Sequence, residues 1–551
     1  MNIVLQLLLK YFNEEKYTVI MVVVLLVIIH TLQTNAISII SSNIIESIEQ
    51  NNYGVVFQYY KYYLGVSFIF LILMGIDELL QIRILTKLTP WLRTEFFKLI
   101  LRSNNEDLTQ DNVIKYSSPM NRVSYAATML VHNLLSNMLT NGTFVVIISA
   151  YFLYKDITLG LVFFIANIIL VGFIGMNWEG MMEYKNASEQ NLNENEVRVV
   201  DLFNNFDKII TRGQTEKEIE EYSLRANDCI ASSVKFHLYS SKQYFIMTTF
   251  IYTIIFCAIY YLIRLKQTNE IDTKTFIAFF TILLLYRDKL TNVLSLIPGM
   301  MEFHGRVNMA VKQFDTISAK YAETSHVKQY KDVKLPFNKI EYVGVSYKYN
   351  SAENPLFKDF NLTLDTKDKV VGITGLSGKG KSTVMKLLLK LYDTSDGNIY
   401  IDGVNIRDIN PNYIRENITY VNQSSRLLDR SVVNNLMYGC QDSEKCKEYL
   451  DIILKYPAVQ NLYKNVDLEN KSAGSLGESL SGGQRQIVNI LSGLINPSPI
   501  LILDEPTNAL DLGLKKELLG ILDDFRKYKK CIIIITHDRD VYHLFDERIT
   551  M

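Results

Sequence analysis

The chain has 551 residues, which is enough for two or more domains. Its formal net charge is −1, so no strongly basic face predicts a nucleic-acid partner. Hydrophobic residues make up 48% of the chain, but charges are scarce in several long windows of the first 300 residues and common afterwards. The five cysteines show neither metal nor disulfide spacing, which fits a reducing cytosolic environment for the second half of the chain.

Long apolar runs in the first half predict membrane spans, because a helix needs about 20 apolar residues to cross a bilayer. A sixth run, from Thr275 to about Met301, is interrupted only by Arg287, Asp288 and Lys289. Buried helices of a large soluble protein are the alternative for one run, but six in succession favour an all-α transmembrane domain of six spans over residues 1–303. The five runs without Lys, Arg, Asp or Glu are Tyr17–Ile45, Tyr62–Ile76, Asn133–Tyr154, Ile157–Trp178 and Gln243–Ile263.

The connections between the runs predict the topology of an integral, multi-pass membrane protein in a lipid bilayer. Two long segments, about residues 83–132 and 179–242, are rich in Lys and Arg, whereas the short loops hold few. The positive-inside rule therefore places these cytoplasmic loops, the N-terminus and everything after the sixth run in the cytoplasm. With few Gly or Pro, each long segment is expected to form a helical hairpin that extends on the order of 35 to 40 Å beyond the membrane.

The character of the sequence changes after Met301. Residues 304–336 are expected to be a charged linker that begins as a helix, and short apolar strands then alternate with helices. This alternation indicates an α/β domain over residues 337–551. The chain is thus expected to be multi-domain, with an all-α membrane part and an α/β part.

A glycine-rich loop follows the predicted strand Val370–Thr374. The sequence GLSGKGKST matches the phosphate-binding pattern G-x-x-x-x-G-K-[ST]. In such a loop backbone N–H groups surround phosphate oxygens, Lys381 can reach the β- and γ-phosphates, and the Ser382 hydroxyl can ligate Mg²⁺. A glycine-rich surface turn is the alternative, but the strand–loop–helix context favours a nucleotide site. The predicted phosphate-binding residues are Gly375, Ser377, Gly378, Gly380, Lys381, Ser382 and Thr383.

Two further strand ends carry groups suited to hydrolysis. Ile500–Leu503 is predicted as a buried strand with Asp504 and Glu505 at its carboxyl end, where open parallel sheets bind ligands. Asp504 is placed to hold Mg²⁺, and Glu505 to take a proton from an attacking water as general base. The apolar stretch CIIIIT leads to His537, which we interpret as a γ-phosphate contact. An acidic turn and a structural histidine are the alternatives.

A second anion site is predicted at SLSGGQRQIVNIL, Ser479–Leu491. Two adjacent glycines open a helix, and such a helix start offers unpaired backbone N–H groups and the positive end of the helix dipole. One chain therefore carries two phosphate-type sites about a hundred residues apart.

These residues resemble the ATP-binding cassette (ABC) transporters, and in particular an exporter-type half-transporter, in which a six-span membrane domain precedes one cassette. The resemblance covers nearly the whole chain and is carried in family order by GLSGKGKST, VNQSSRLLDRSVVNNL, LSGGQRQ, ILILDEP, NALD and ITHD. It implies ATP and Mg²⁺ as cofactors, and ATP hydrolysis coupled to export of an unidentified substrate. It also implies a dimer with a second copy or a related half-transporter, because the LSGGQ helix of one cassette caps the ATP of the other.

The resemblance implies further residue roles. Tyr349 would stack on adenine, and Gln423 would contact Mg²⁺ and the γ-phosphate and act in catalysis with Glu505 and His537. Ser481 and Gly483 would bind the γ-phosphate held by the partner, and Asp511 would lie across the dimer seam. An ordinary strand aromatic is the alternative for Tyr349, and a surface loop residue for Gln423.

The sequence departs from the family at two places. Ile487 and Ser492 stand where arginines usually follow the signature, and the strands that usually come after the last histidine are not recognisable, which predicts a short sheet edge. The residues Arg287, Asp288 and Lys289 would leave a surplus positive charge for an anionic or polar cargo if they lie at membrane depth. A position at the cytoplasmic interface is the alternative.

Other functions of the same fold stay open at this point. An ATP-gated channel or a regulatory ABC membrane protein without pumping would share these motifs. A DNA-repair or translation ATPase is disfavoured by the spans, and an importer by the presence of spans and cassette on one chain. The substrate, the membrane and the choice between homodimer and heterodimer are not encoded in the motifs.

Overall fold

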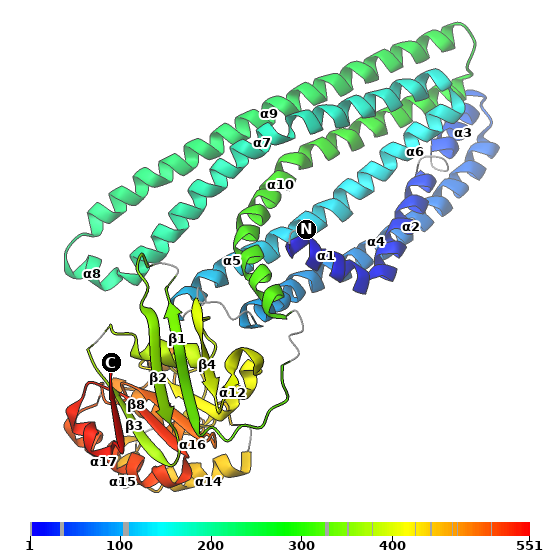
Figure 1. Ribbon diagram of the computed structural model, residues 1–551. Helices are drawn as coiled ribbons and strands as arrows, with labels where there is room; N and C mark the ends of the chain where they lie inside the picture. Colours follow the sequence, from blue (N-terminus) through cyan, green and yellow to red (C-terminus); the bar gives the residue numbers. More distant parts are fainter. Residues whose placement is uncertain are drawn as a thin grey trace. The chain divides into compact units, whose positions relative to one another are not determined.

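The computed structural model describes residues 3–33, 38–102, 110–325, 330–349, 352–376, 378–424, 426–440, 443–464, 467–470, 472–508 and 510–551. The chain divides near residue 321 into two compact units. The first is built from helices, and the second combines sheets with shorter helices (Figure 1).

The helical unit contains several helices that are far longer than a bilayer requires. α9 has 53 residues, which corresponds to about 80 Å at 1.5 Å per residue, whereas a hydrocarbon core is about 30 Å thick. The segments that separate the apolar runs in sequence are therefore mostly continuations of the same helices. The elements are α1 (Ile3–Glu14), α2 (Lys16–Thr31), α3 (Ser38–Glu49), α4 (Tyr53–Arg102), α5 (Gln110–His132), the π-helix η3 (Asn133–Leu139), α6 (Thr140–Lys155), α7 (Ile157–Asn204), α8 (Phe206–Thr211), α9 (Thr215–Gln267) and α10 (Thr273–Ser325).

Four helices among the described residues are long and apolar enough to cross a membrane: Tyr53–Arg102, Tyr116–Lys155, Ile157–Asn204 and Thr215–Gln267. The first predicted run is divided, because α2 ends at Thr31 and α3 begins at Ser38. α2 is apolar but has only 16 residues. The all-α membrane part is thus present, whereas the count of six spans stays a prediction.

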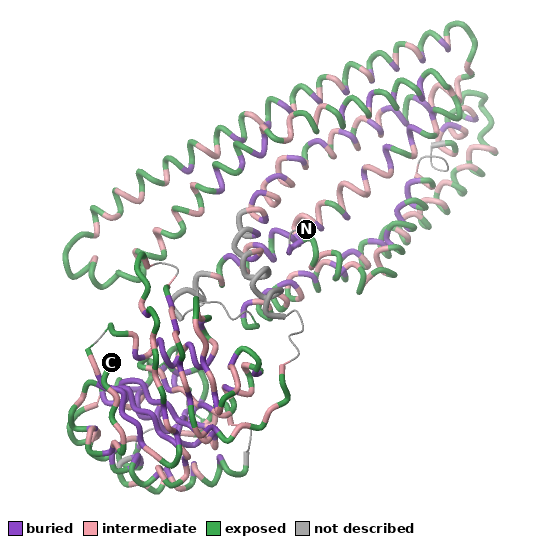
Figure 2. Tube along the Cα trace, in the orientation of Figure 1, coloured by how far each residue is buried: buried purple, intermediate pink, exposed green. Residues whose placement is uncertain are grey.

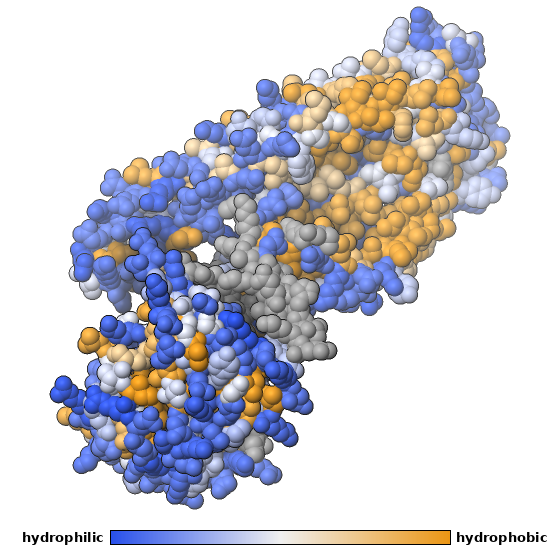
Figure 3. Space-filling view, viewed as in Figure 1, coloured by the Kyte–Doolittle hydropathy of each residue, from blue (hydrophilic) through white to orange (hydrophobic). Residues whose placement is uncertain are grey.

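The outer surface of the helical unit is apolar over a broad area (Figure 3). On α7, Val171 is 69% exposed and Ile168 is 58% exposed, and on α9 Phe256 is 65% exposed. Patches of this size are rare on monomeric soluble proteins, so this surface fits the acyl chains of a bilayer. Toward α8 the same helices are covered by polar residues, as expected for segments outside the membrane.

The second unit contains two sheets. A five-stranded parallel sheet has the order β6-β7-β8-β3-β9, and a four-stranded antiparallel sheet has the order β2-β1-β4-β5. Strands β7 and β8 are buried at every residue, which matches the apolar runs ILIL, before Asp504, and CIIII (Figure 2). The strands are β1 (Lys339–Tyr347), β2 (Phe357–Asp365), β3 (Lys369–Thr374), β4 (Asp396–Ile401), β5 (Val404–Asn405), β6 (Ile418–Val421), β7 (Ile500–Asp504), β8 (Cys531–Ile535) and β9 (Glu547–Thr550).

The helices of this unit connect the parallel strands. Among them, α16 packs on both β6 and β7. The helices are α11 (Lys381–Leu388), η4 (Ile406–Asp408), α12 (Pro411–Asn417), α13 (Val432–Leu436), α14 (Ser443–Ile453), α15 (Pro457–Leu462), η5 (Ser475–Gly477), α16 (Gly482–Ile495), α17 (Leu512–Phe525), η6 (Arg526–Tyr528) and η7 (Arg539–Leu544).

Two expectations about this unit are wrong. The sheet does continue after His537, because β9 pairs with β3 in parallel. The cysteines do include a pair, since Cys440 and Cys446 form a disulfide. Their separation of six residues gave no recognisable pattern; Cys440 follows α13, and Cys446 lies within α14.

Candidate functional site

A cavity of about 550 Å³ lies at the carboxyl ends of the parallel strands. β3 runs into the glycine-rich loop, β7 ends at Asp504, and β8 is followed by His537. Carboxyl ends of neighbouring parallel strands meet at one sheet edge, which is where such sheets bind ligands. The lining residues are Tyr349, Leu356, Gly375, Leu376, Gly378, Gly380, Lys381, Ser382, Thr383, Gln423, Asp504, Glu505 and His537.

The glycine-rich loop has the conformation that only glycine adopts easily. Gly378 and Gly380 have φ of 81° and 88°, and a Cβ at Gly380 would lie 2.4 Å from the ring of Phe357. Lys381 opens α11 and is buried, and its Nζ donates to the carbonyl oxygens of Gly375 at 3.1 Å and Leu376 at 3.0 Å. An ammonium held over its own loop in this way can bind phosphate oxygens placed within the loop.

Asp504 is suited to a divalent cation. The residue is 3% exposed, and its Oδ2 accepts a hydrogen bond from the Tyr420 hydroxyl at 2.7 Å. Its Oδ1 is buried and has no hydrogen-bond partner among the described residues. A buried carboxylate oxygen without a partner is costly, so a cation at this position is favourable. The hydroxyl of Ser382 and the amide of Gln423 line the same cavity.

The cation would be held by few protein ligands. The described residues contain no group of three or more His, Cys, Asp or Glu side chains that could hold a metal ion. Mg²⁺ commonly uses one or two protein oxygens together with substrate phosphates and water. The residues present therefore fit Mg²⁺ that arrives with a nucleotide.

Tyr420 was missed by the sequence analysis. Burial raises the pKa of its phenol, and the neighbouring Asp504 carboxylate raises that pKa further. The phenol consequently stays protonated and donates its proton to Asp504, which fixes the carboxylate. A tyrosine on β6 faces this carboxylate only because β6 and β7 pair in register, with Tyr420 beside Ile502.

Glu505 is held in an unusual backbone conformation. Its φ is +48°, a region that non-glycine residues rarely adopt, and its N–H donates to the Ile535 carbonyl at 2.8 Å. The residue is 8% exposed, and its side-chain Oε1 lies 3.0 Å from His537 Nδ1. This contact joins the ends of β7 and β8 and directs both side chains into the cavity. A carboxylate in this position can accept a proton from water.

Tyr349 and Thr383 lie at the other side of the cavity. The Tyr349 hydroxyl and Thr383 Oγ1 are 2.6 Å apart. The Tyr349 ring is packed edge-on against Tyr347, with centroids 5.0 Å apart, and against Tyr392 at 5.8 Å. A fixed aromatic ring beside a phosphate loop is suited to stack on a base.

Ser481, Gly483 and Asp511 are not among the residues that line this cavity. Ser481 caps α16 through the bond from Gln484 N–H to its Oγ at 3.2 Å, and Gln484 Oε1 accepts from the Ser481 N–H at 2.9 Å. Asp511 caps α17 by accepting from the Leu514 N–H at 2.9 Å. Ser481 is exposed, as is Asp511, while Gly483 is half-buried. Ser377 lies outside the described residues.

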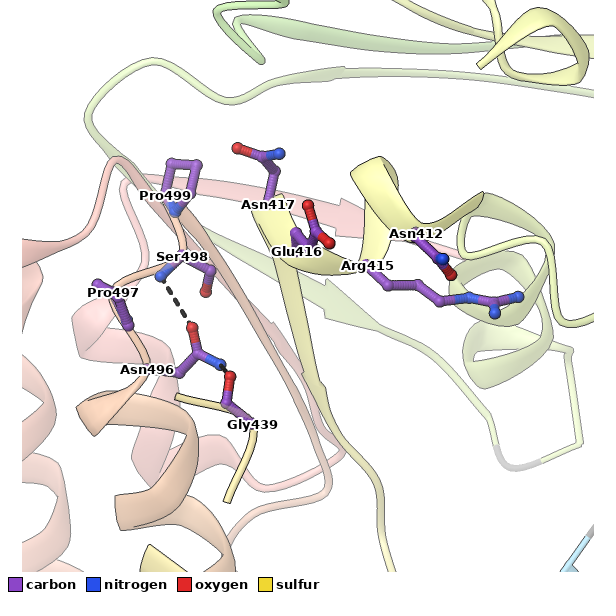
Figure 4. Close-up of a pocket in the computed structure, with 9 residues that line it drawn as sticks. All are labelled: Asn412, Arg415, Glu416, Asn417, Gly439, Asn496, Pro497, Ser498 and Pro499. Atoms are coloured by element: carbon purple, nitrogen blue, oxygen red, sulfur yellow. Dashed lines mark hydrogen bonds between the residues drawn. The ribbon is translucent and has the colours of Figure 1, made fainter. Parts of the chain in front are cut away.

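A second cavity of about 450 Å³ lies at the opposite edge of the parallel sheet, where β6 and β7 begin (Figure 4). Asn496, just past α16, donates to the Gly439 carbonyl at 3.3 Å and accepts from the Ser498 N–H at 3.1 Å. The ammonium of buried Lys529 donates to the carbonyl oxygens of Asn496 and Ser498. Burial lowers the pKa of Lys529 to about 7. These bonds fix the C-terminal end of α16, the helix that begins in the LSGGQ signature.

The geometry defines a class of protein: an α/β nucleotide-binding unit joined to helices that cross a membrane. The family profile described as "ABC transporter transmembrane region" matches residues 20–290, and the profile described as "ABC transporter" matches residues 357–508. The chain belongs to the ABC transporters, with the two regions in the order of an exporter-type half-transporter. It is a multi-pass integral membrane protein.

Curated relatives match over part of their length. The ATP-dependent lipid A-core flippase of Haemophilus influenzae (strain 86-028NP) is 34% identical over 208 residues, which are 38% of this chain and 35% of the relative. A candidate multidrug export ATP-binding/permease protein of Staphylococcus aureus (strain bovine RF122 / ET3-1) is 34% identical over 204 residues, which are 37% of this chain and 35% of the relative. The matches thus span about a third of these relatives.

A solved structure shares the fold over nearly the whole chain. It is a bacterial Atm1-family ABC exporter with ATP bound, with a TM-score of 0.78 and 18% identity. The match covers 98% of this chain and 93% of the other. At this identity the likeness establishes the fold and leaves the cargo open.

Proposed function

We propose that this protein couples ATP hydrolysis to the export of a molecule across a membrane, as a dimer of half-transporters that works by alternating access. The observation that supports this most directly is the cavity that gathers Lys381, Asp504 and Glu505 in a chain that also carries membrane-crossing helices. Residues 337–551 would form the ATP-binding domain and residues 1–303 the membrane domain, joined by 304–336. The N-terminus and the ATP-binding domain would be cytoplasmic.

Most residues of the cavity have a task in binding or hydrolysing ATP. Gly375, Gly378 and Gly380 surround the phosphates with backbone N–H groups, and Lys381 binds the β- and γ-phosphates. Asp504, Ser382 and Gln423 would hold Mg²⁺, which when bound neutralises charge on the phosphates. Glu505 takes the proton of the attacking water, and His537 orients Glu505 and contacts the γ-phosphate. Tyr349 stacks on the adenine.

The signature residues would complete the site of the other chain. Ser481, Gly483 and Asp511 stand at the starts of α16 and α17, outside the cavity of their own chain. A helix start with free backbone N–H groups binds a phosphate well. ATP bound between two cassettes would hold them together, and hydrolysis would release them. The long helices α7 and α9 would carry this motion to the membrane.

Transport in reconstituted vesicles tests the proposal. The purified full chain would first be screened for compounds that stimulate its ATPase activity. A stimulating compound should then accumulate against its gradient in inside-out proteoliposomes with Mg-ATP, and accumulation should stop in Lys381→Ala vesicles. An ATP-gated channel would instead let the compound equilibrate without accumulating, and this result would contradict the proposal.

A further inference from the structure

A buried carboxylate lies deep in the helical unit. Asp77 follows the uncharged run Tyr62–Ile76 on α4 and is only 5% exposed. The depth of Asp77 in the membrane is estimated from the ion pair between Lys87 and Glu15. The two groups are 2.8 Å apart, and Glu15 directly precedes α2. Asp77 is ten residues before Lys87, so it lies about 15 Å further along α4. This is about half the thickness of a bilayer core, if that core begins where α2 begins.

The charge of Asp77 has no protein partner among the described residues. Its Oδ2 accepts a hydrogen bond from the Gln81 amide at 2.6 Å. Its Oδ1 is buried without a hydrogen-bond partner, and Asp77 is absent from the ion pairs of the described part of the chain. A buried carboxylate without a counter-charge is costly, and ionisable groups at membrane depth mark ligand pathways. A cation supplied from outside would remove this cost.

The π-helix η3 faces Asp77 through a chain of hydrogen bonds. Ser136 Oγ donates to Gln81 Oε1 at 2.5 Å and lies 3.2 Å from His132 Nδ1. A hydroxyl has one proton, so His132 must be the donor to Ser136. In this series of hydrogen bonds each group donates toward Asp77 Oδ2, so Asp77 Oδ1 is left available to a ligand. π-helical turns are rare and occur frequently at functional sites.

The surroundings favour an organic cation over a metal ion. The described residues contain no group of three or more His, Cys, Asp or Glu side chains that could hold a metal ion. Apolar side chains of α2, α5 and η3, among them Leu26, Val131 and Leu135, form one buried cluster with side chains of α4. We propose that Asp77 is the acidic anchor of a site in the helical unit that binds the cationic group of an apolar molecule. This inference rests on the proposed export function, since it names the chemical class of the cargo.

Binding of two ions of equal shape and opposite charge tests the inference. The probes are tetraphenylphosphonium and tetraphenylborate, and equilibrium binding to the purified full chain is measured without nucleotide. The wild-type protein should prefer tetraphenylphosphonium. Asp77→Asn should weaken its binding by about tenfold or more, because the charge is lost while the shape is kept. Asp77→Glu should retain binding within about threefold.

Glu78 provides the matched control, because it is the next carboxylate on α4 and is exposed. Glu78→Gln should change the affinity by less than about twofold. The circular dichroism spectrum and the unfolding midpoint of Asp77→Asn should match those of the wild-type protein, which shows that this variant is folded. Equal binding of both probes, or wild-type affinity in Asp77→Asn, would overturn the inference. Because binding is measured without ATP, the two proposals can fail separately. If uphill transport is absent but Asp77-dependent binding is observed, the export proposal is contradicted and the inference about this site is not.

Discussion

Replacing Glu505 by Gln tests the assignment of the general base. Glutamine keeps the size of the side chain and can still accept or donate a hydrogen bond, so the 3.0 Å contact with His537 can persist. The N–H of residue 505 continues to bond the Ile535 carbonyl, which holds the +48° conformation. The substitution therefore removes a negative charge and a proton acceptor with little other change to the cavity.

The size of the effect follows from this geometry. General-base catalysis contributes about 10²- to 10⁴-fold, so kcat should fall by this factor, or roughly 3 to 5 kcal/mol in the activation free energy. The substitution leaves in place Lys381, which is proposed to bind the phosphates, and Asp504, which is proposed to hold Mg²⁺. Nucleotide affinity should accordingly stay within about threefold of the wild-type value.

Two assays on the purified protein separate these quantities. Phosphate release gives kcat, and fluorescence of a bound ATP analogue gives the dissociation constant. Lys381→Ala serves as the contrasting variant, because it should lose nucleotide binding as well. A Glu505→Gln protein that hydrolyses ATP within about fivefold of the wild-type rate would refute the role of Glu505 as base.

Three further outcomes are expected. Tyr420→Phe removes the donor to Asp504 and should raise the Mg²⁺ concentration for half-maximal ATPase activity by about 10- to 100-fold; an unchanged Mg²⁺ titration would contradict this role. In the folded protein Lys529 is neutral above about pH 7, whereas in the unfolded chain it stays protonated up to about pH 10.5. The free energy of unfolding should therefore rise by up to about 1.4 kcal/mol per pH unit above pH 7. Thermal unfolding at pH 7 and pH 9 should show this rise in the wild type and a smaller one in Lys529→Met. Gly372→Ala places a Cβ 2.1 Å from the Phe545 ring and should cost about 1 to 3 kcal/mol in unfolding free energy without changing the KM for ATP.

The parts of the site that are contiguous in sequence were predictable. The loop from Gly375 to Thr383 carries its own strand, glycines and helix start, so its shape depends little on distant residues. Asp504, Glu505 and His537 were predictable because unbroken apolar strands precede them and end at one sheet edge. Helices in the two long segments that separate the apolar runs were likewise expected from the scarcity of Gly and Pro.

Features that depend on tertiary contacts were not predictable. Nothing in the sequence pairs Tyr420 with Asp504, since their contact needs the register of β6 against β7. Asp77 and Ser136 are joined through Gln81 only because α4 faces η3. Within YRDKL, Arg287 bonds its neighbour Asp288 at 2.7 Å, and Lys289 lies 5.4 Å from the Phe144 ring centroid. A role of these charges in cargo binding stays a prediction.

The most direct test of the account asks which chain completes the ATP site. Leu376→Cys marks the phosphate loop, and Gly482→Cys marks the LSGGQ signature at the start of α16; both positions are exposed. The two substitutions would be placed on separately tagged chains. Both chains carry Glu505→Gln to retain ATP, and the exposed Cys257 is replaced by Ser. Oxidation with Mg-ATP should produce a disulfide between the two tagged chains, and without ATP the yield should fall sharply. An ATP-loaded protein that forms no such link would contradict the claim that one triphosphate is shared by two chains.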